Sequence, residues 1–218
     1  MQKETQQTRT ILFYGDSIMD VKTDPKKPQY LGQSFPKYIQ KMLNRKYLNK
    51  KIKYYNTSKG GIQTKNLYYS LKEKCIKYKP NIIIILIGIN DTWDRQYEKT
   101  LATEFEQYRF QQVYETLIKT IHEKLIETKI IIIEPYYLPT REKHKNWEKD
   151  LKPKRQIIKN IARKYMCIHI PMHEILNTNI NAKEYLQYVE KDGVHPTNKG
   201  HAKIAEIICE KIVEEKLL

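Results

Sequence analysis

Short apolar runs that alternate with helical segments constrain the fold of this chain more than any other feature of its sequence. Segments between the runs carry apolar residues at helical spacing. Strands that alternate with helices need crossover connections, which give a mostly parallel sheet with helices on both faces. The sequence therefore predicts an α/β fold with three layers, α/β/α. The five predicted strands are dense in β-branched residues and bounded by turn residues, as buried parallel strands are: Thr10–Tyr14, Lys53–Asn56, Asn81–Ile87, Lys129–Glu134 and Cys167–Ile170.

Three helices can be placed from spacing and capping residues. Ser34 precedes Phe35-Pro36, which is typical of an N-cap followed by proline in the first helical turn. A C-terminal helix is expected to begin near Thr197. A long helix is expected before the fourth strand, and its apolar positions approximate one face: Phe105, Tyr108, Val113, Leu117, Ile121 and Leu125.

The length of 218 residues suits one domain, and no repeat, linker or low-complexity stretch divides the chain. Residues 1–9 are polar and lack the apolar core of a secretory signal, so they predict a flexible N-terminal tail. Residues 10–218 are then expected to form one domain.

The expected cellular location and the expected lack of a cofactor both rest on features that the sequence does not contain. The longest apolar run ends at Ile87 and is too short to cross a bilayer, so no membrane partner is expected. Cys75, Cys167 and Cys209 lie far apart, and neither a disulfide framework nor a zinc site is indicated. We therefore expect a cytoplasmic protein with no metal and no cofactor.

The formal net charge of +15 allows two readings. A basic surface can bind nucleic acid or another polyanion. However, the lysines are spread along the whole chain and interleaved with glutamates, and no nucleic-acid-binding motif is present. Solvated helix faces are therefore the favoured reading, and no nucleic-acid partner is expected.

Polar clusters follow the predicted strands, where ligands of parallel sheets bind. Gly15-Asp16-Ser17 ends the first strand, "TSKGGIQT" follows the second, and Gly88-Ile89-Asn90-Asp91 follows the third. A fourth cluster, "DGVHP", precedes the last helix. We expect these clusters to converge at one edge of the sheet.

The residue types in these clusters suit nucleophilic catalysis. A serine hydroxyl such as that of Ser17 needs a base to accept its proton, and histidine titrates near neutrality. Asp192 and His195 lie three residues apart, which lets the carboxylate orient the imidazole ring. Backbone N–H groups at Ser17 and at a glycine of "SKGGI", with the Asn90 amide, would supply donors for an oxyanion.

The stretches "FYGDSIMD", "NTSKGGIQT", "IGINDTWD" and "DGVHPTNKGHAKIA" resemble the four sequence blocks of the SGNH, or GDSL-type, hydrolase family. The resemblance implies a flavodoxin-like five-stranded parallel sheet and an SGNH hydrolase domain over residues 10–218. It also implies that Ser17 is the nucleophile, that His195 is the base and that Asp192 is its partner. Ser17, Gly61 and Asn90 would then form the oxyanion hole. Gly61 is preferred to Gly60 because it lies five residues after the block's asparagine.

A finer resemblance concerns the substrate. "GINDTW", "FEQYRFQQVYETLI" and "IIIIEPYYLP" are similar to the branch that contains acetylxylan esterases, some of which are oligomers. This implies a serine esterase that removes O-acetyl groups from acetylated xylo-oligosaccharides, with Trp93 and Asp16 as candidate substrate-binding residues. Met19, Ser58 and Asp94 depart from the branch pattern.

Three alternatives stay open at this point. The same fold also hosts lysophospholipases and acyl-thioesterases, which would use the same triad on longer acyl chains. A basic polyanion-binding module with a vestigial site is the alternative from another class. A homo-oligomer is compatible with the resemblance, although no face of the sequence indicates an interface.

Overall fold

The computed structural model describes residues 8–98, 101–142 and 144–218. Its five strands form one parallel sheet in the order β2-β1-β3-β4-β5, which confirms the predicted flavodoxin-like sheet. The strands are β1 (Arg9–Gly15), β2 (Ile52–Asn56), β3 (Ile82–Leu86), β4 (Lys129–Ile133) and β5 (Ile168–Ile170). The α-helices are α1 (Phe35–Lys46), α2 (Thr64–Tyr69), α3 (Leu71–Lys74), α4 (Asn90–Trp93), α5 (Glu104–Lys124), α6 (His144–Lys164), α7 (Met172–Asn179), α8 (Tyr185–Tyr188) and α9 (Asn198–Glu214), and short 3-10 turns cover Ile76–Tyr78 and Ala182–Glu184.

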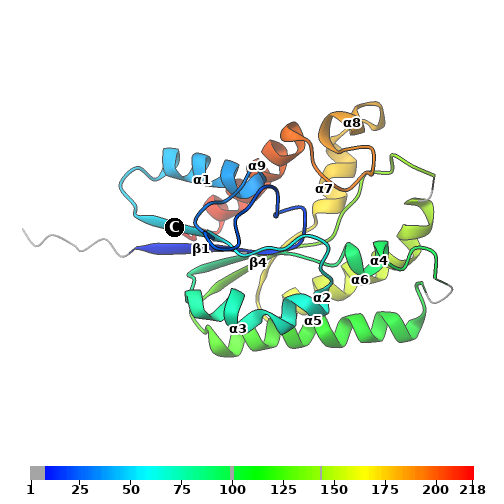
Figure 1. Ribbon diagram of the computed structural model, residues 1–218, viewed down its shortest axis with the longest axis horizontal. Helices are drawn as coiled ribbons and strands as arrows, with labels where there is room; N and C mark the ends of the chain where they lie inside the picture. The colour runs from blue at the N-terminus through cyan, green and yellow to red at the C-terminus, as the bar shows by residue number, and fades with distance from the viewer. Residues whose placement is uncertain (1–7, 99–100, 143) are drawn as a thin grey trace, which may run out of the picture.

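Helices cover both faces of the sheet, as predicted. Figure 1 shows α1, α7 and α9 on one side and α2, α3 and α5 on the other. Side chains alternate along β1, so that Ile11 and Phe13 join the core beneath the first group while Leu12 and Tyr14 join the core beneath the second. Because both faces are buried, β3 is buried at all of its positions and reads as an uninterrupted isoleucine-rich run.

The sheet begins one residue earlier than the predicted domain boundary. Arg9 already belongs to β1 and pairs in register with Ile52 of β2. Of the rest of the predicted N-terminal tail, position 8 is described and residues 1–7 lie outside the described residues. No helix of the described segments is long and apolar enough to span a membrane.

The predicted face of α5 is wrong at its N-terminal end. Phe105 and Tyr108 are 68% and 61% exposed. Nine residues at about 100° per residue place Tyr108 on the opposite side of the helix from the buried Leu117. The stripe that packs against the sheet instead consists of Phe110, Tyr114, Leu117, Ile118 and Ile121.

Both predicted helix starts are confirmed, with one difference in bonding. Thr197 is the N-cap of α9, and its hydroxyl accepts a hydrogen bond from the Gly200 N–H at 3.2 Å. Ser34 occupies the N-cap position of α1 with proline in the first turn. Its buried hydroxyl, however, donates to the Met19 carbonyl instead of capping the helix, and so ties α1 to the segment that follows β1.

Candidate active site

The turn after β1 presents Ser17 at the carboxyl end of the sheet. β1 and β3 approach closely there, because a Cβ on Gly15 would overlap the Leu86 carbonyl oxygen. Only glycine fits at this position. The Asp16 carboxylate then accepts the Ile18 N–H at 3.1 Å, and the Asp16 carbonyl accepts the Met19 N–H at 3.1 Å. These bonds form the tight turn that carries Ser17.

Ser17, His195 and Asp192 form a continuous hydrogen-bonded chain. The Ser17 Oγ lies 2.9 Å from His195 Nε2, although 178 positions separate the two residues in the sequence. His195 Nδ1 lies 2.8 Å from Asp192 Oδ2. The other carboxylate oxygen, Oδ1, accepts the backbone N–H groups of Val194 at 2.8 Å and of His195 at 2.9 Å. The imidazole is thus held between a hydroxyl and a carboxylate.

Asp192 and His195 each stabilise the charged form of the other. The hydrogen bond to Asp192 raises the pKa of His195 above its ordinary 6.5, against the opposing effect of burial. Partial burial works to raise the pKa of Asp192, but hydrogen bonds from the His195 ring and from two backbone N–H groups outweigh it and lower the pKa to about 2. Asp192 is therefore ionised at neutral pH and stabilises a positive charge on the ring.

Two backbone N–H groups near Ser17 are available to a ligand. Within the described residues, neither the Ser17 N–H nor the Gly61 N–H donates a hydrogen bond. The Gly60 N–H, by contrast, already donates to Asp20 Oδ2 at 2.8 Å, which favours Gly61 over Gly60 as an oxyanion donor. Gly61 has a φ of +72°, in the left-handed region that glycine adopts without strain.

Asn90 starts α4, and Ile87-Gly88-Ile89 separate it from the end of β3 at Leu86. Its side-chain Nδ2 donates to the Ile62 carbonyl at 2.9 Å. A primary amide carries two donors, so one N–H of Asn90 is fixed by this bond and the second stays available. The bond also ties Asn90 to the residue next to Gly61.

The two candidate substrate-binding residues differ in the structure. The Trp93 ring lies 6.0 Å from the His195 ring and 5.2 Å from the Trp147 ring, and it is partly exposed. Asp16 is fully buried, so the structure does not support the expected contact with substrate. Burial raises the pKa of Asp16 to about 7, although its backbone hydrogen bond and His195 oppose this shift.

Sequence reasoning missed Asp20 and Thr64 as parts of the site. Asp20 holds Gly60 through the bond described above, and Thr64 donates twice to Asp91 Oδ2, from its N–H and its hydroxyl, both at 3.0 Å. The signal for Asp20 was an acidic residue directly after the serine turn. The signal for Thr64 was a hydroxyl residue at the start of the helix after the glycine loop.

The chain is similar to known proteins of one family. Residues 13–203 match the model of the GDSL-like lipase/acylhydrolase family. An acetylxylan esterase from Geobacillus stearothermophilus is 26% identical over an alignment of 211 residues, which covers 93% of this chain and 93% of that protein.

Solved structures show the same fold. A putative GDSL-like lipase from Parabacteroides merdae superposes with a TM-score of 0.79 at 24% identity, covering 93% of this chain and 94% of that one. An acetylxylan esterase from Geobacillus stearothermophilus superposes with a TM-score of 0.78 at 22% identity, covering 94% of each chain. The family match spans most of the chain, and the protein therefore belongs to the GDSL-like lipase/acylhydrolase family.

Proposed function

We propose that this protein is a serine esterase that removes acetyl groups from carbohydrate hydroxyls. The observation that carries the proposal is the hydrogen-bonded chain from Ser17 Oγ through His195 to Asp192. The backbone N–H groups of Ser17 and Gly61, which donate no hydrogen bond within the described part of the chain, support it. Residues 9–218, which include the first residue of β1, would form the hydrolase domain.

The geometry supports a two-step mechanism. His195 Nε2 accepts the Ser17 proton while Oγ attacks the ester carbonyl carbon, and Asp192 stabilises the imidazolium. The carbonyl oxygen becomes an oxyanion that receives hydrogen bonds from the N–H groups of Ser17 and Gly61 and from the Asn90 amide. The imidazolium returns its proton to the leaving sugar oxygen, which leaves an acetyl group on Ser17. Water then loses a proton to His195 and attacks the acetyl carbonyl, and the bond to Ser17 Oγ breaks as His195 returns that proton to Oγ, which releases acetate.

The choice of acetyl rests on Trp93 and on the relatives. The Trp93 ring stands beside His195 and so borders the place where the acyl group would lie. The curated relative is an acetylxylan esterase, and solved structures of such an esterase include catalytic mutants in which a serine, an aspartate or a histidine is replaced by alanine. We therefore propose an acetylated xylo-oligosaccharide as the substrate.

Hydrolysis of p-nitrophenyl acetate, butyrate and octanoate, together with acetate release from acetylated xylo-oligosaccharides, tests the proposal. We expect acetate to be the best ester, sugar esters to be cleaved, and Ser17→Ala to be inactive. The matched control is Ser70→Ala. It removes a serine hydroxyl that is hydrogen-bonded to the Leu67 carbonyl and the Tyr14 hydroxyl and not to a histidine. A preference for octanoate would favour the lysophospholipase or thioesterase alternative. An active Ser17→Ala variant would refute the triad.

Some of the lysines are paired with acidic side chains at helix surfaces. They form ion pairs with glutamates three or four residues away on the same helix, for example Lys119 with Glu123 and Lys211 with Glu214. Such pairs are typical of solvated helix faces. Salt-sensitive binding of nucleic acid or acidic polysaccharide that persists in Ser17→Ala would instead favour the binding-module alternative. Cytoplasmic location and homo-oligomerisation stay predictions.

A further inference from the structure

The helix α4 is short for the role that we propose for it. Asn90–Trp93 is a single turn, which begins with the oxyanion donor and ends with the tryptophan beside His195. One isolated turn has little helical stability of its own, because nucleation costs more than one turn of hydrogen bonds returns. Contacts with the rest of the protein must therefore fix the direction in which Asn90 points.

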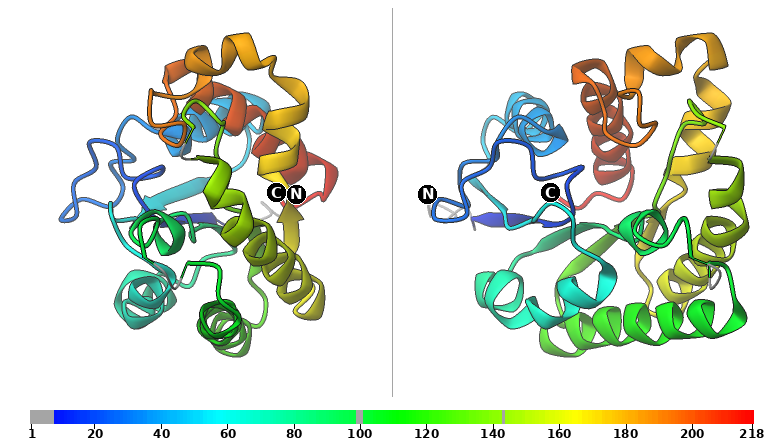
Figure 2. Two further views of the ribbon diagram at one scale, coloured as in Figure 1. Left: turned by 90° about the vertical axis from the view of Figure 1, so that its right-hand side faces the viewer. Right: turned by 45° about the vertical axis from the view of Figure 1, so that its right-hand side comes forward.

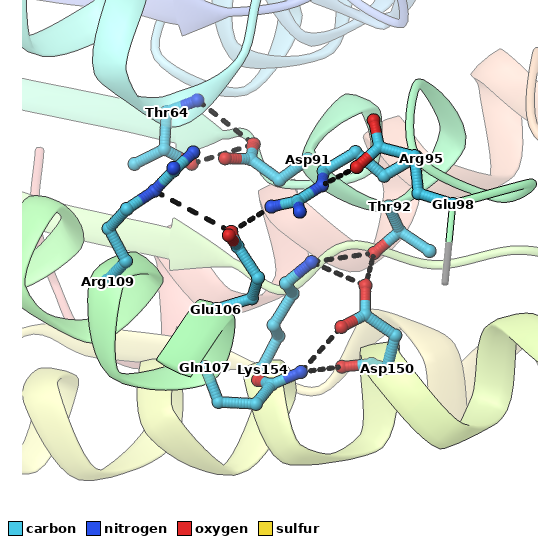
Figure 3. A network of polar contacts seen from close by, with 10 residues as sticks. All are labelled: Thr64, Asp91, Thr92, Arg95, Glu98, Glu106, Gln107, Arg109, Asp150 and Lys154. Atoms are coloured by element: carbon cyan, nitrogen blue, oxygen red, sulfur yellow. Dashed lines mark hydrogen bonds and ion pairs between the residues drawn. The ribbon is translucent and has the colours of Figure 1, made fainter. Parts of the chain in front are cut away.

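The first contact joins α4 to the loop that carries Gly61. Asp91 Oδ2 accepts both hydrogen bonds from Thr64, at the start of α2 (Figure 3). One turn later, Asp94 Oδ2 accepts the Gln63 side-chain amide at 2.9 Å. Together with the bond from Asn90 to Ile62, these contacts hold two of the proposed oxyanion donors at a fixed separation, but they do not fix the pair relative to the sheet.

The second contact joins α4 to α6 through a buried network. The Thr92 hydroxyl donates to Asp150 Oδ2 at 2.6 Å and accepts from Lys154 Nζ at 3.0 Å. Lys154 Nζ also lies 2.5 Å from Asp150 Oδ2, and Gln107 of α5 donates to Asp150 Oδ1 at 2.5 Å (Figure 3). Thr92, Asp150 and Lys154 are 0%, 1% and 3% exposed. This buried network is a polar link from α4 to the long helices of the domain, beside the contact of the Trp93 ring with Trp147 of α6.

Packing alone does not hold this side of α4. A cavity of about 310 Å³ borders the network and is lined in part by Asp91, Arg95 and Lys154. The helix therefore has space into which it could shift, and directional hydrogen bonds restrict that movement. The helix α4 contacts α6, and Figure 2 shows it beyond the ends of the strands.

The buried ion pair between Lys154 and Asp150 is not explained by stability alone. Removing two charges from water costs several kcal/mol, and apolar residues of similar volume are often as stabilising or more so. What an apolar cluster lacks is direction, because the hydrophobic effect does not specify orientation. A hydroxyl that donates to one partner and accepts from another has one orientation only.

We propose that Thr92, Asp150 and Lys154 are positioning residues that orient α4 so that the Asn90 amide and the Trp93 ring face Ser17 and His195. This inference rests on the proposed esterase function. It assigns a catalytic consequence to residues that lie behind the site and touch no substrate.

The test separates orientation from stability with three variants. Thr92→Val keeps the shape of the side chain and removes its hydroxyl, whereas Thr92→Ser keeps the hydroxyl. The combination Thr92→Val, Asp150→Leu and Lys154→Met replaces the three buried polar side chains by apolar ones, and Gln107 keeps its hydrogen bond to the backbone carbonyl of residue 150 at 3.2 Å. Thr128→Val is the matched control. Thr128 lies just before β4, at the opposite end of the sheet, and its hydroxyl donates to the Pro80 carbonyl at 2.6 Å.

We expect Thr92→Val to lower kcat on p-nitrophenyl acetate about tenfold to hundredfold, as small displacements of catalytic groups do. KM should change less than about threefold, because the lost interaction acts in the transition state. Thr92→Ser should recover most of the activity, and Thr128→Val should retain it. The triple variant should have a urea unfolding midpoint no lower than that of the wild type, and yet its kcat should be as low as that of Thr92→Val. The pH dependence should not move in any of these, because His195 is untouched.

Two results would overturn the inference. One is a kcat within about twofold of the wild type for Thr92→Val and for the folded triple variant. The other is a loss of activity that only follows a loss of folded protein, with Thr92→Ser no better than Thr92→Val. If Ser17→Ala is inactive while Thr92→Val is fully active, this inference alone fails. If Ser17→Ala is active, the proposed function itself fails.

Discussion

Asp192→Asn is the substitution whose effect the geometry specifies most closely. Asp192 Oδ1 accepts two backbone N–H groups, from Val194 and His195, while Oδ2 accepts the His195 ring. An asparagine can satisfy the two backbone donors only with its oxygen, so its NH₂ group takes the place of Oδ2. That group is a donor and needs an acceptor at His195 Nδ1. The ring proton is thereby moved to Nε2, which can then no longer accept the proton of Ser17.

The expected loss is large because the wrong tautomer removes the base and the missing charge removes its stabilisation. The equivalent change in a serine protease lowers kcat about 10⁴-fold, which corresponds to about 5.5 kcal/mol of transition-state stabilisation. The pH dependence should also change. Neutral His195 is the working form, so wild-type activity rises with pH and its midpoint reflects a His195 pKa that Asp192 raises above 6.5. Without the carboxylate, the midpoint should move to lower pH.

Rates of p-nitrophenyl acetate hydrolysis between about pH 5 and 9 measure both effects. Glu127→Gln, an exposed acid-to-amide change in the loop before β4, is the control for the loss of one negative charge. An Asp192→Asn variant that retains activity within about tenfold of the wild type would refute the tautomer argument. So would a midpoint that moves to higher pH.

Three further predictions concern the oxyanion donor, the serine turn and a buried histidine. Asn90→Ala should lower kcat about a hundredfold or more with little change in KM, because one oxyanion donor is lost; equal kcat values in steady-state assays would exclude Asn90 from this role. Gly15→Ala should destabilise the fold by about 1 to 3 kcal/mol, because its Cβ would overlap the Leu86 carbonyl; urea unfolding at neutral pH measures this, and an unchanged midpoint would contradict it. His201 is buried, accepts the Phe35 N–H at 3.2 Å, and has a pKa lowered to about 4 by burial and by His195. Its stabilising contribution is complete above pH 6.5, the ordinary value, and is lost as pH falls toward 4; urea midpoints that stay constant over this range would disprove it.

The sequence predicted the strands well because buried parallel strands carry two signals at once. Runs such as Ile82–Leu86 are apolar on both faces and are bounded by turn residues. The face of α5 was harder to predict, because Phe105 and Tyr108 are apolar by composition but lie outside the stripe that meets the sheet. Spacings of three to five residues do not distinguish a helix face from its neighbours over so many turns.

Local patterns predicted the residues of the candidate site, whereas their convergence was expected only from the general rule that ligands bind at the carboxyl ends of parallel strands. Ser17, Asn90 and His195 each stand at the end of a strand or the start of a helix, where local patterns mark them. Which strands lie side by side depends on the sheet order, which no local pattern encodes. The buried role of Asp150 and Lys154 could not be predicted from the sequence, because oppositely charged residues four apart on a helix usually form a solvated surface pair. Burial between α4 and α6 is a property of the assembled fold.

The central claim is that Ser17 is a nucleophile activated by His195, and covalent labelling tests it most directly. An organophosphonate ester reacts with activated serine hydroxyls, and mass spectrometry of the intact protein and its peptides counts and locates the added groups. The account predicts one phosphonyl group per chain on Ser17, with none added to Ser17→Ala and a strongly slowed reaction in His195→Ala. An unlabelled wild-type protein, or a label on another residue, would contradict it.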